Sequence, residues 1–212
     1  MLLDELLPQI VIPDGAVDLP ALKPDASEVW LEIGFGGGEH MAAQAALRPD
    51  VLILGAEPFL NGVASALRHI DEAALGNIRL RQGDARQLLM DLPDASLTRI
   101  FILFPDPWPK TRHHKRRLIQ DETLVDMARV LAPGGGLRFA TDWCDYAEWT
   151  LERAIRSPHF HWSAERAANW RANSVDHIAT RYEMKRLGDC EPVFLDFERT
   201  ADGSAPQAGR IR

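Results

Sequence analysis

The segment FPDPWPKTRHHKRR, residues 104–117, places an acid and an aromatic residue directly before a dense run of cations. Prolines occupy every second position from 105 to 109, and each fixes its own φ and pushes the preceding residue towards extended geometry. Asp106 and Trp108 are therefore expected in a stiff, non-helical loop. A rigid carboxylate beside a positive patch favours chemistry on a polyanion. The alternative interpretation is a proline-rich turn followed by a solvated helix start.

The cations of this segment suit the phosphates of a nucleic acid, and two histidines stand among them. In order, the residues are Lys110, Arg112, His113, His114, Lys115, Arg116 and Arg117. We call residues 112–117 the basic segment. The lysines and arginines predict RNA binding with a steep salt dependence. Two adjacent histidines point apart on a helix or a strand, and no third ligand is spaced nearby, so no metal site is predicted.

The composition is that of a single globular domain. Its 212 residues are 46% hydrophobic and carry a formal charge of −7, which argues against a protein that wraps nucleic acid over its whole surface. No apolar run reaches membrane-spanning length, and the N-terminal residues lack the basic region of a signal peptide. Cys144 and Cys190 do not stand in a paired metal-binding spacing, so free thiols in a reducing compartment are expected. These observations predict a cytoplasmic protein without a membrane partner.

Apolar strands alternate with amphipathic helices along most of the chain, which predicts an α/β fold. Strands are expected at 29–33, 51–56, 77–82, 98–103, 137–140, 160–163 and 193–197, and helices at 39–47, 60–70 and 146–156, with another carrying Leu124 to Leu131. Residues 1–26 are expected to form a lead-in with a short amphipathic helix, 27–199 a single domain and 200–212 a flexible tail. The order predicts a doubly wound, mostly parallel sheet between two layers of helices.

A glycine-rich turn follows the first expected strand and leads into a helix. Gly34, Gly36 and Gly38 give the spacing G-x-G-x-G, a geometry that lets backbone approach a nucleotide-like ligand. The dinucleotide fingerprint would need a small residue at position 39. The acid there, Glu39, would instead repel a pyrophosphate at the helix N-terminus. A cationic ligand would meet no such repulsion, although a purely structural glycine turn gives the same pattern.

Acids stand at or just after the carboxyl ends of five expected strands, along the edge where doubly wound sheets bind ligands. They are Glu32, Glu57, Asp84, Asp106 and Asp142. Any one of them could be a turn former or a helix cap, but five along one edge favour a crevice for a cation. Glu57 stands where an acid accepts hydrogen bonds from ribose hydroxyls.

These motifs resemble a known family. The run EIGFGGG, residues 32–38, resembles the first motif of class I S-adenosylmethionine-dependent methyltransferases. FPDPWPK, RHHKRR, ATDW and TRYE, within about residues 28–197, resemble the motifs of bacterial tRNA (guanine-N(7)-)-methyltransferases. Two features depart from that family. TRYE stands where TKFE is more usual. Members of the family commonly carry an arginine-rich N-terminal segment, whereas this sequence starts at MLLDELLPQI.

The resemblance implies a Rossmann-like sheet of seven strands, the last antiparallel, and methylation of ring nitrogen 7 of a guanine in the variable loop of tRNA. The cofactor S-adenosylmethionine would be bound by Glu32, Gly34, Gly36, Gly38, Glu57, Asp84, Ala85 and Asp106. Asp106 would also stand at the catalytic site. The substrate would be contacted by Lys110, Asp142, Thr180, Arg181, Tyr182 and Glu183, and the RNA by Arg112, His113, His114, Lys115, Arg116 and Arg117. The sequence leaves open whether the protein is a monomer or a homodimer.

Ring nitrogen 7 of guanine has a lone pair and no proton, so its methylation needs no general base. The enzyme has to align the reactants and supply negative charge where positive charge arrives, a task for which Asp106 is the candidate. Asp142 or Glu183 could accept hydrogen bonds from the Watson–Crick edge of the guanine. Trp108 or Tyr182 could stack on a base that has left its own stack, with packed core as the favoured place for Trp108.

Three other functions fit parts of the pattern. A NAD(P)-dependent oxidoreductase shares the glycine turn and the following acid, but it fails at Glu39 and has no obvious hydride site in this sequence. A non-enzymatic RNA-binding module could keep the same fold, and the intact Asp106 argues against it. A methyltransferase that acts on another substrate would keep both the glycine turn and the row of acids.

Overall fold

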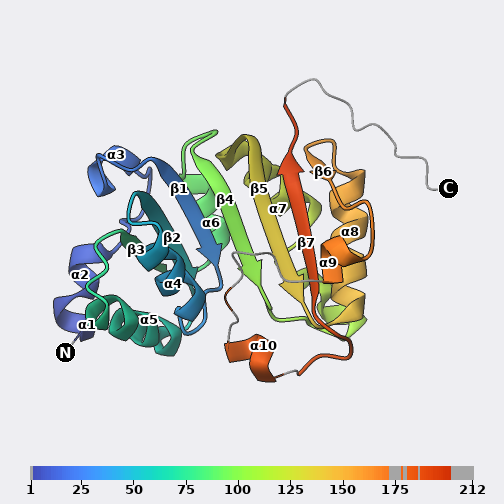
Figure 1. Cartoon of the computed structure of the whole chain (residues 1–212), viewed down its shortest axis with the longest axis horizontal. Helices are drawn as coiled ribbons and strands as arrows, with labels where there is room; N and C mark the ends of the chain where they lie inside the picture. The colour runs from blue at the N-terminus through green and yellow to red at the C-terminus, as the bar shows by residue number, and fades with distance from the viewer. Residues whose placement is uncertain (1, 172–177, 179–180, 186, 202–212) are drawn as a thin grey trace.

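A mixed sheet of seven strands organises the protein (Figure 1). The computed structural model describes residues 2–171, 178, 181–185 and 187–201. The strands are β1 (Glu28–Ile33), β2 (Val51–Glu57), β3 (Ile78–Gln82), β4 (Leu97–Leu103), β5 (Leu131–Thr141), β6 (Phe160–Trp162) and β7 (Val193–Arg199). Their order is β3-β2-β1-β4-β5-β7-β6, and β7 runs antiparallel to both of its neighbours. The predicted mostly parallel sheet with an antiparallel last strand is confirmed.

Helices cover both faces of this sheet, which gives the predicted three layers. They are α1 (Leu2–Glu5), α2 (Leu7–Ile10), α3 (Leu19–Leu22), α4 (Glu39–Leu47), α5 (Leu60–Glu72), α6 (Ala85–Asp91), α7 (Asp121–Val130), α8 (Cys144–Arg156), α9 (Ala168–Arg171) and α10 (Arg181–Lys185), with a 3-10 helix, η1 (Thr111–Arg116). Along β2, Val51 and Ile53 pack into one apolar cluster with α4 and α5, and Leu52 and Leu54 into another with α6, α7 and α8. No helix among these described residues is both long enough and apolar enough to cross a membrane.

The lead-in packs onto the edge of the sheet. α1 and α2 are separate short helices, because Pro8 stands in the first turn of α2 and cannot donate a helical hydrogen bond. Val11 then bridges to Leu80 of β3, and the N–H of Ile12 donates to the carbonyl oxygen of Leu80 at 2.8 Å. Ile12 and Val17 are both buried. The lead-in therefore adds to the core at the β3 edge, as two short helices instead of the single one expected.

Two elements differ from those expected from the sequence. Helix α6 is not among the helices expected from the sequence. It begins after Asp84, whose side chain accepts a hydrogen bond from the N–H of Arg86. β5 begins directly after α7, whereas the strand is expected only from residue 137. The pairing of β4 with β5 shifts register between Leu97 and Arg99. The glycine run at 134–136 therefore forms an irregularity inside the strand instead of a loop before it.

Candidate active site

Two adjoining cavities lie where the carboxyl ends of β1 and β2 meet the loop after β4. Their volumes are about 340 and 280 Å³, and together we call them the edge crevice. Both are lined by Ile33, Gly34, Pro58, Pro105, Asp106 and Leu118. Cavities of this size hold small molecules, and this is the edge at which doubly wound sheets bind their ligands.

The glycine turn after β1 forms one wall of the edge crevice. Gly34 and Gly36 line it with φ values of +70° and +54°, which residues with side chains rarely adopt. Gly38, with φ of +81°, serves the packing of two helices instead. A Cβ atom at Gly38 would come within 2.7 Å of the Cβ of Ala66 on α5. Gly38 therefore brings α4 close to α5, and its expected contact with the cofactor stays a prediction.

Glu57 ends β2 with its carboxylate fixed by two backbone donors. Oε2 accepts a hydrogen bond from the N–H of Gly36 at 2.9 Å, and Oε1 accepts one from the N–H of Phe59 at 3.0 Å. Glu57 is 4% exposed and lines the larger cavity. Burial raises the pKa of Glu57 above its usual value, and the nearby charge of Asp106 raises that pKa further. Hydroxyl donors on a ligand would stabilise this carboxylate.

Glu32, by contrast, faces the interior. Its Oε2 lies 2.7 Å from Nδ1 of His40, and the two residues are 3% and 2% exposed. On the far side of the ring, Nε2 of His40 lies 3.4 Å from Nε2 of Gln44. Glu32 therefore anchors the first turns of α4 beneath the glycine turn. Its expected contact with the cofactor stays a prediction, beside this positioning role.

Asp84 and Ala85 line the smaller cavity at the start of α6. The guanidinium of Arg86 donates to both carboxylate oxygens of Asp84 at 2.7 to 3.0 Å, and this ion pair lowers the pKa of Asp84. Arg86 lines the same cavity. This end of the edge crevice therefore presents an acid that already has a cationic partner, while the end at Glu57 presents a buried acid held by neutral donors.

The loop after β4 carries Asp106 between two residues with unfavourable backbone geometry. Phe104 and Trp108 have φ of +52° and +44°, a left-handed conformation that non-glycine residues adopt only when their surroundings enforce it. The N–H of Phe104 donates to the carbonyl oxygen of Ala140 at 2.8 Å, which holds the start of the loop on β5. Asp106 is exposed and lines both cavities. The predicted non-helical loop at Asp106 is confirmed, but Phe104 and Trp108, which directly precede prolines, are left-handed and not extended as expected.

Arg117 lies inside the protein, behind this loop. It is 1% exposed, its Nε donates to the carbonyl oxygen of Pro107 at 2.9 Å, and its Nη2 donates to Oδ2 of Asp145. Its guanidinium carbon lies 4.8 and 5.0 Å from the ring centroids of Tyr146 and Trp149. The expectation that Arg117 contacts RNA is wrong, because a buried and paired guanidinium is out of reach of a phosphate.

The other cations of the segment remain on the surface. Exposed side chains are those of Lys110, Arg112, Lys115 and Arg116, whereas His113 and His114 are half-buried. His114 packs edge-on to Trp149 at 5.2 Å between ring centroids. RNA contact stays a prediction for the exposed cations and for the two histidines. The ring contacts of the histidines also give them a structural role.

Trp108 is not part of the packed core, and its stacking on a base stays a prediction. It is half-buried, with the guanidinium carbon of Arg116 4.8 Å from its ring centroid and the ring of His113 edge-on at 6.0 Å. A cation over an aromatic face is a favourable contact. Trp108 therefore orders two side chains of the basic segment, and it lines the smaller cavity together with Arg116.

The structure describes part of the expected substrate side. Asp142 is 7% exposed, lines the larger cavity and accepts a hydrogen bond on Oδ2 from the N–H of Gly188 at 2.8 Å. Glu183 is half-buried in α10. Thr180 lies outside the described residues, as do the side chains of Arg181 and Tyr182. Their contacts with the substrate stay predictions.

Other residues that line the edge crevice escaped sequence reasoning. They include Phe59, Arg86, Leu118, Trp143 and Leu187. Phe59 and Leu187 are large apolar side chains, and each is 66% exposed. The available signal for Phe59 was its position two residues after a strand-end acid. Leu187 gave no comparable signal, because its place depends on the approach of a distant segment.

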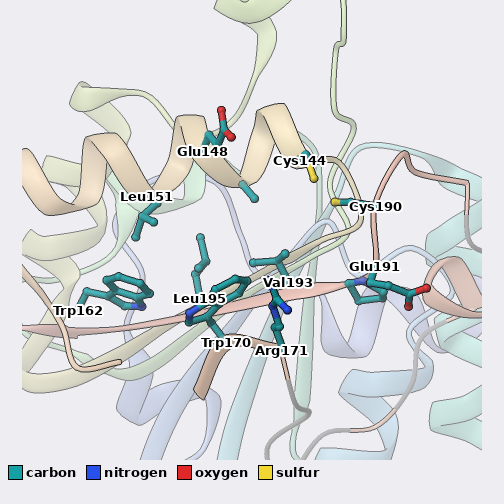
Figure 2. A pocket seen from close by; sticks show the side chains of 12 residues that line it. Cys144, Glu148, Leu151, Trp162, Trp170, Arg171, Cys190, Glu191, Val193 and Leu195 are labelled. Carbon is teal, nitrogen blue, oxygen red and sulfur yellow. The ribbon is translucent and has the colours of Figure 1, made fainter. Parts of the chain in front are cut away.

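A larger cavity of about 660 Å³ lies elsewhere, between α8 and the strands β6 and β7 (Figure 2). Its walls are mainly apolar, with Leu151, Trp162 and Leu195 among them. Volume alone would favour this cavity as the active site. Convergent charged groups with shifted pKa values favour the edge crevice, and chemistry is the better guide to a catalytic centre.

Comparison with known proteins gives close sequence relatives. A family described as "Putative methyltransferase" matches residues 26–194. The tRNA (guanine-N(7)-)-methyltransferase of Caulobacter sp. (strain K31) is 61% identical over 199 residues, which covers 93% of this chain and 87% of that protein. Proteins of the same name from Hyphomonas neptunium and Rhodospirillum rubrum are 52% and 46% identical, covering 87% and 97% of this chain and 84% of each relative.

Solved structures with the same fold are more distant in sequence. The 16S rRNA methyltransferase KamB superposes with a TM-score of 0.56 at 15% identity, over 85% of this chain and 92% of that one. A 16S rRNA (adenine-N(1))-methyltransferase from Catenulisporales acidiphilia, crystallised with cosubstrate SAM, gives a TM-score of 0.57 at 15% identity, over 87% and 91% of the two chains. At this identity the likeness concerns the fold.

Proposed function

Because this chain belongs to the tRNA (guanine-N(7)-)-methyltransferase family, we propose that its edge crevice holds S-adenosylmethionine and presents it to a guanine of tRNA. The protein transfers a methyl group to ring nitrogen 7 of guanine and forms 7-methylguanosine. The position of Asp106 carries the site assignment. This exposed carboxylate lines both cavities and lies close enough to Glu57 to raise its pKa.

The residues of the edge crevice fit S-adenosylmethionine. The buried carboxylate of Glu57 would be stabilised by two ribose hydroxyl donors. A Cβ at Gly34 would meet no atom within 4 Å, so the turn leaves open space on that side. Pro58 and Ala85 offer apolar contact for an adenine ring. Asp106 supplies the negative charge that a sulfonium requires.

S-adenosylmethionine, when bound, supplies a methyl group activated by an adjacent sulfonium. The chain contributes positioning and charge. Asp106 provides a carboxylate where positive charge arrives on the purine, and because ring nitrogen 7 has no proton to lose, it acts as a fixed charge and not as a base. Pro105 and Pro107 restrict the backbone on both sides of it. Arg117 holds the carbonyl oxygen of Pro107 from behind.

Recognition of the tRNA falls to the side of the crevice beyond Asp106. Asp142 and Glu183 are suited to accept hydrogen bonds from the donor groups of guanine, together with contacts from residues 180–182 that the family resemblance implies. Lys110 and the exposed cations of the basic segment are suited to phosphates. We expect the target guanine in the variable loop, where it can leave its stack.

The setting of the protein follows from this substrate. We place its activity in the cytoplasm, because the two free cysteines are expected in a reducing compartment and the substrate tRNA is found there. The oligomeric state stays a prediction, either a monomer or a homodimer. Sedimentation of the full chain with and without tRNA would decide between the two.

The test is methylation of unmodified tRNA with methyl-labelled S-adenosylmethionine, followed by mapping of 7-methylguanosine by base-specific cleavage. Asp106→Ala and Asp106→Asn are expected to lose about 10²-fold or more in turnover while still binding tRNA, since a positioned charge contributes on that scale. Asp71→Asn, at an exposed acid on α5, is the control. Equal losses of tRNA binding and turnover in Asp106→Asn would contradict the role of Asp106. Retention of NAD in place of S-adenosylmethionine would contradict the whole proposal.

A further inference from the structure

Two cysteines that are far apart in the sequence meet beside α8. Cys144 begins α8 and Cys190 lies just before β7, and their sulfur atoms point towards each other (Figure 2). Asp189 joins them, and one ligand atom from each of the three residues lies within 4.8 Å of the other two. Both cysteines are free thiols. A cluster of two thiols and a carboxylate has the donor set of a metal site.

Hydrogen bonds hold these residues together. The N–H of Cys144 donates to Oδ1 of Asp189 at 2.9 Å, which ties the start of α8 to the segment before β7. Within that segment, the N–H of Cys190 donates to the carbonyl oxygen of Asp142 at 3.0 Å. Gly188 packs so closely that a Cβ there would lie within 1.9 Å of the same oxygen. The backbone is therefore already arranged, and a ligand would have less to order.

We propose that Cys144, Asp189 and Cys190 bind one soft divalent cation of the Zn²⁺ type, and we call this cluster the dithiol site. Thiolates favour Zn²⁺ over Mg²⁺ or Ca²⁺, which prefer oxygen ligands. Three protein ligands leave a fourth position for water or another donor. Cys144 and Asp189 are exposed, and both cysteines line the 660 Å³ cavity, which gives an ion access and room for that fourth ligand.

The dithiol site departs from the absence of metal expected from the sequence. That expectation rested on local spacing, and the donors here come together only through the fold. A bound cation would join the start of α8 to the segment that holds Asp142 on the substrate side of the edge crevice. The inference does not rest on the proposed function, because binding of the cation is measured on the protein alone.

The test is titration of the full chain with Co²⁺ as a spectroscopic stand-in for Zn²⁺, under a non-chelating reductant. We expect one Co²⁺ per chain, a thiolate-to-metal charge-transfer band in the near ultraviolet, and displacement of Co²⁺ by Zn²⁺. Cys144→Ser, Cys190→Ser and Asp189→Asn should each weaken Co²⁺ binding by at least about tenfold, since loss of even an outer partner has that effect. His161→Ala, at an exposed histidine on β6, should bind as the wild type does.

Thermal unfolding supplies a second measurement. Zn²⁺ should raise the melting temperature of the wild type, because a ligand that binds the folded state stabilises it. The doubly substituted Cys144→Ser/Cys190→Ser protein should unfold cooperatively without that rise. The proposal is overturned if the wild type gives no thiolate band with Co²⁺. It is also overturned if folded Cys144→Ser and Cys190→Ser bind Co²⁺ as tightly as the wild type.

Discussion

Arg117 donates a hydrogen bond from Nε to the carbonyl oxygen of Pro107, 2.9 Å away, and so reaches the residue that directly follows Asp106. The loop after β4 is therefore held from three directions. Phe104 is bound to β5, the prolines limit the backbone, and Arg117 supports the loop from the interior. A carboxylate that acts as a fixed charge needs such support, because its effect depends on position. We assign Arg117 as a positioning residue for Asp106.

Replacing Arg117 with Met should slow methyl transfer while the protein stays folded. Met fills much of the same apolar space, and the carboxylate of Asp145 that it leaves without a partner is 56% exposed, so the loss of the ion pair leaves no buried charge. The carbonyl oxygen of Pro107 loses its donor, and a displacement of about 1 Å at a reacting group can cost up to about 10²-fold in rate. We expect single-turnover methyl transfer to fall at least about tenfold, with the Kd for S-adenosylmethionine unchanged.

Asp145→Asn serves as the matched variant. It should lose more stability than Arg117→Met and less of the rate of methyl transfer. It leaves the buried guanidinium of Arg117 without its anionic partner, which should lower the free energy of unfolding by on the order of 2 kcal/mol. The carboxylate of Asp145 is itself 56% exposed and can be hydrated when Arg117 is replaced. Urea unfolding of both variants tests this order. A larger loss of stability in Arg117→Met than in Asp145→Asn would contradict it.

Binding of S-adenosylmethionine should weaken as the pH falls through the pKa of Glu57, which lies above its usual value of 4.5 because of burial. A raised carboxyl pKa means that the folded protein holds the proton more tightly than the unfolded chain does. Glu57 thus contributes stability at low pH that disappears as the pH rises through the folded-state pKa. Ribose hydroxyls need the charged form, so binding should improve over that same rise. Calorimetry across mildly acidic pH measures it.

Two variants separate this pH dependence of binding from a general loss of folded protein at acidic pH. Glu57→Gln should bind weakly at every pH and show no midpoint. Asp106→Asn should move the midpoint of binding to lower pH, since the charge of Asp106 helps to raise the pKa of Glu57. An unmoved midpoint in Asp106→Asn would mean that the two carboxylates do not interact.

The salt dependence of tRNA binding should distinguish surface cations from the buried one. Arg112→Ala and Arg116→Ala should each reduce the slope of log Kd against log salt by about 0.7 to 0.9, because each removes one phosphate contact. Arg117→Met should leave the slope unchanged. Filter binding at several salt concentrations gives the slopes. If neither surface substitution changes the slope, the basic segment does not hold phosphates.

Gly62→Ala should weaken cofactor binding although alanine favours helices. Gly62 stands in the first turn of α5, and a Cβ there would lie 2.5 Å from the carbonyl oxygen of Gly36 and 2.9 Å from Cγ of Glu57. We expect overpacking to cost about 1–3 kcal/mol of stability and to displace the ribose-binding carboxylate. Gly76→Ala is the control, because a Cβ there meets nothing within 4 Å. Equal affinities for S-adenosylmethionine in the two variants would contradict this view of Gly62.

The sequence predicts what depends on local order along the chain. Strand and helix periodicity gives the layers, and because parallel strands end at one edge, it also brings Glu57 and Asp106 to the same crevice. The non-helical course of the loop at Asp106 follows from proline spacing, whereas the contacts from Ala140 and Arg117 that hold it do not. The predicted features require no knowledge of which distant residues meet, and the structure has each of them.

What the sequence misses depends on contacts between distant positions. In the sequence, Arg117 is indistinguishable from the surface cations around it. In the structure it is buried against Asp145, Tyr146 and Trp149 of α8. Glu32 reads as a crevice acid, and its partner His40 becomes visible only when α4 turns back over the strand. In both cases residue type is a poor guide, because a charged side chain can be buried once another group pairs with it.

The position of β7 means that the sheet contains a strand synthesised after both of its neighbours. β7 lies between β5 and β6 in the sheet, yet it follows both in the chain. On a ribosome, the glycine turn, Glu57 and Asp106 are all synthesised well before residues 188–199. The segment that holds Asp142 and the partner strand of β6 arrive after them. A nascent chain therefore contains every residue around Glu57 before it contains Gly188, which holds Asp142, and the strand that pairs with β6.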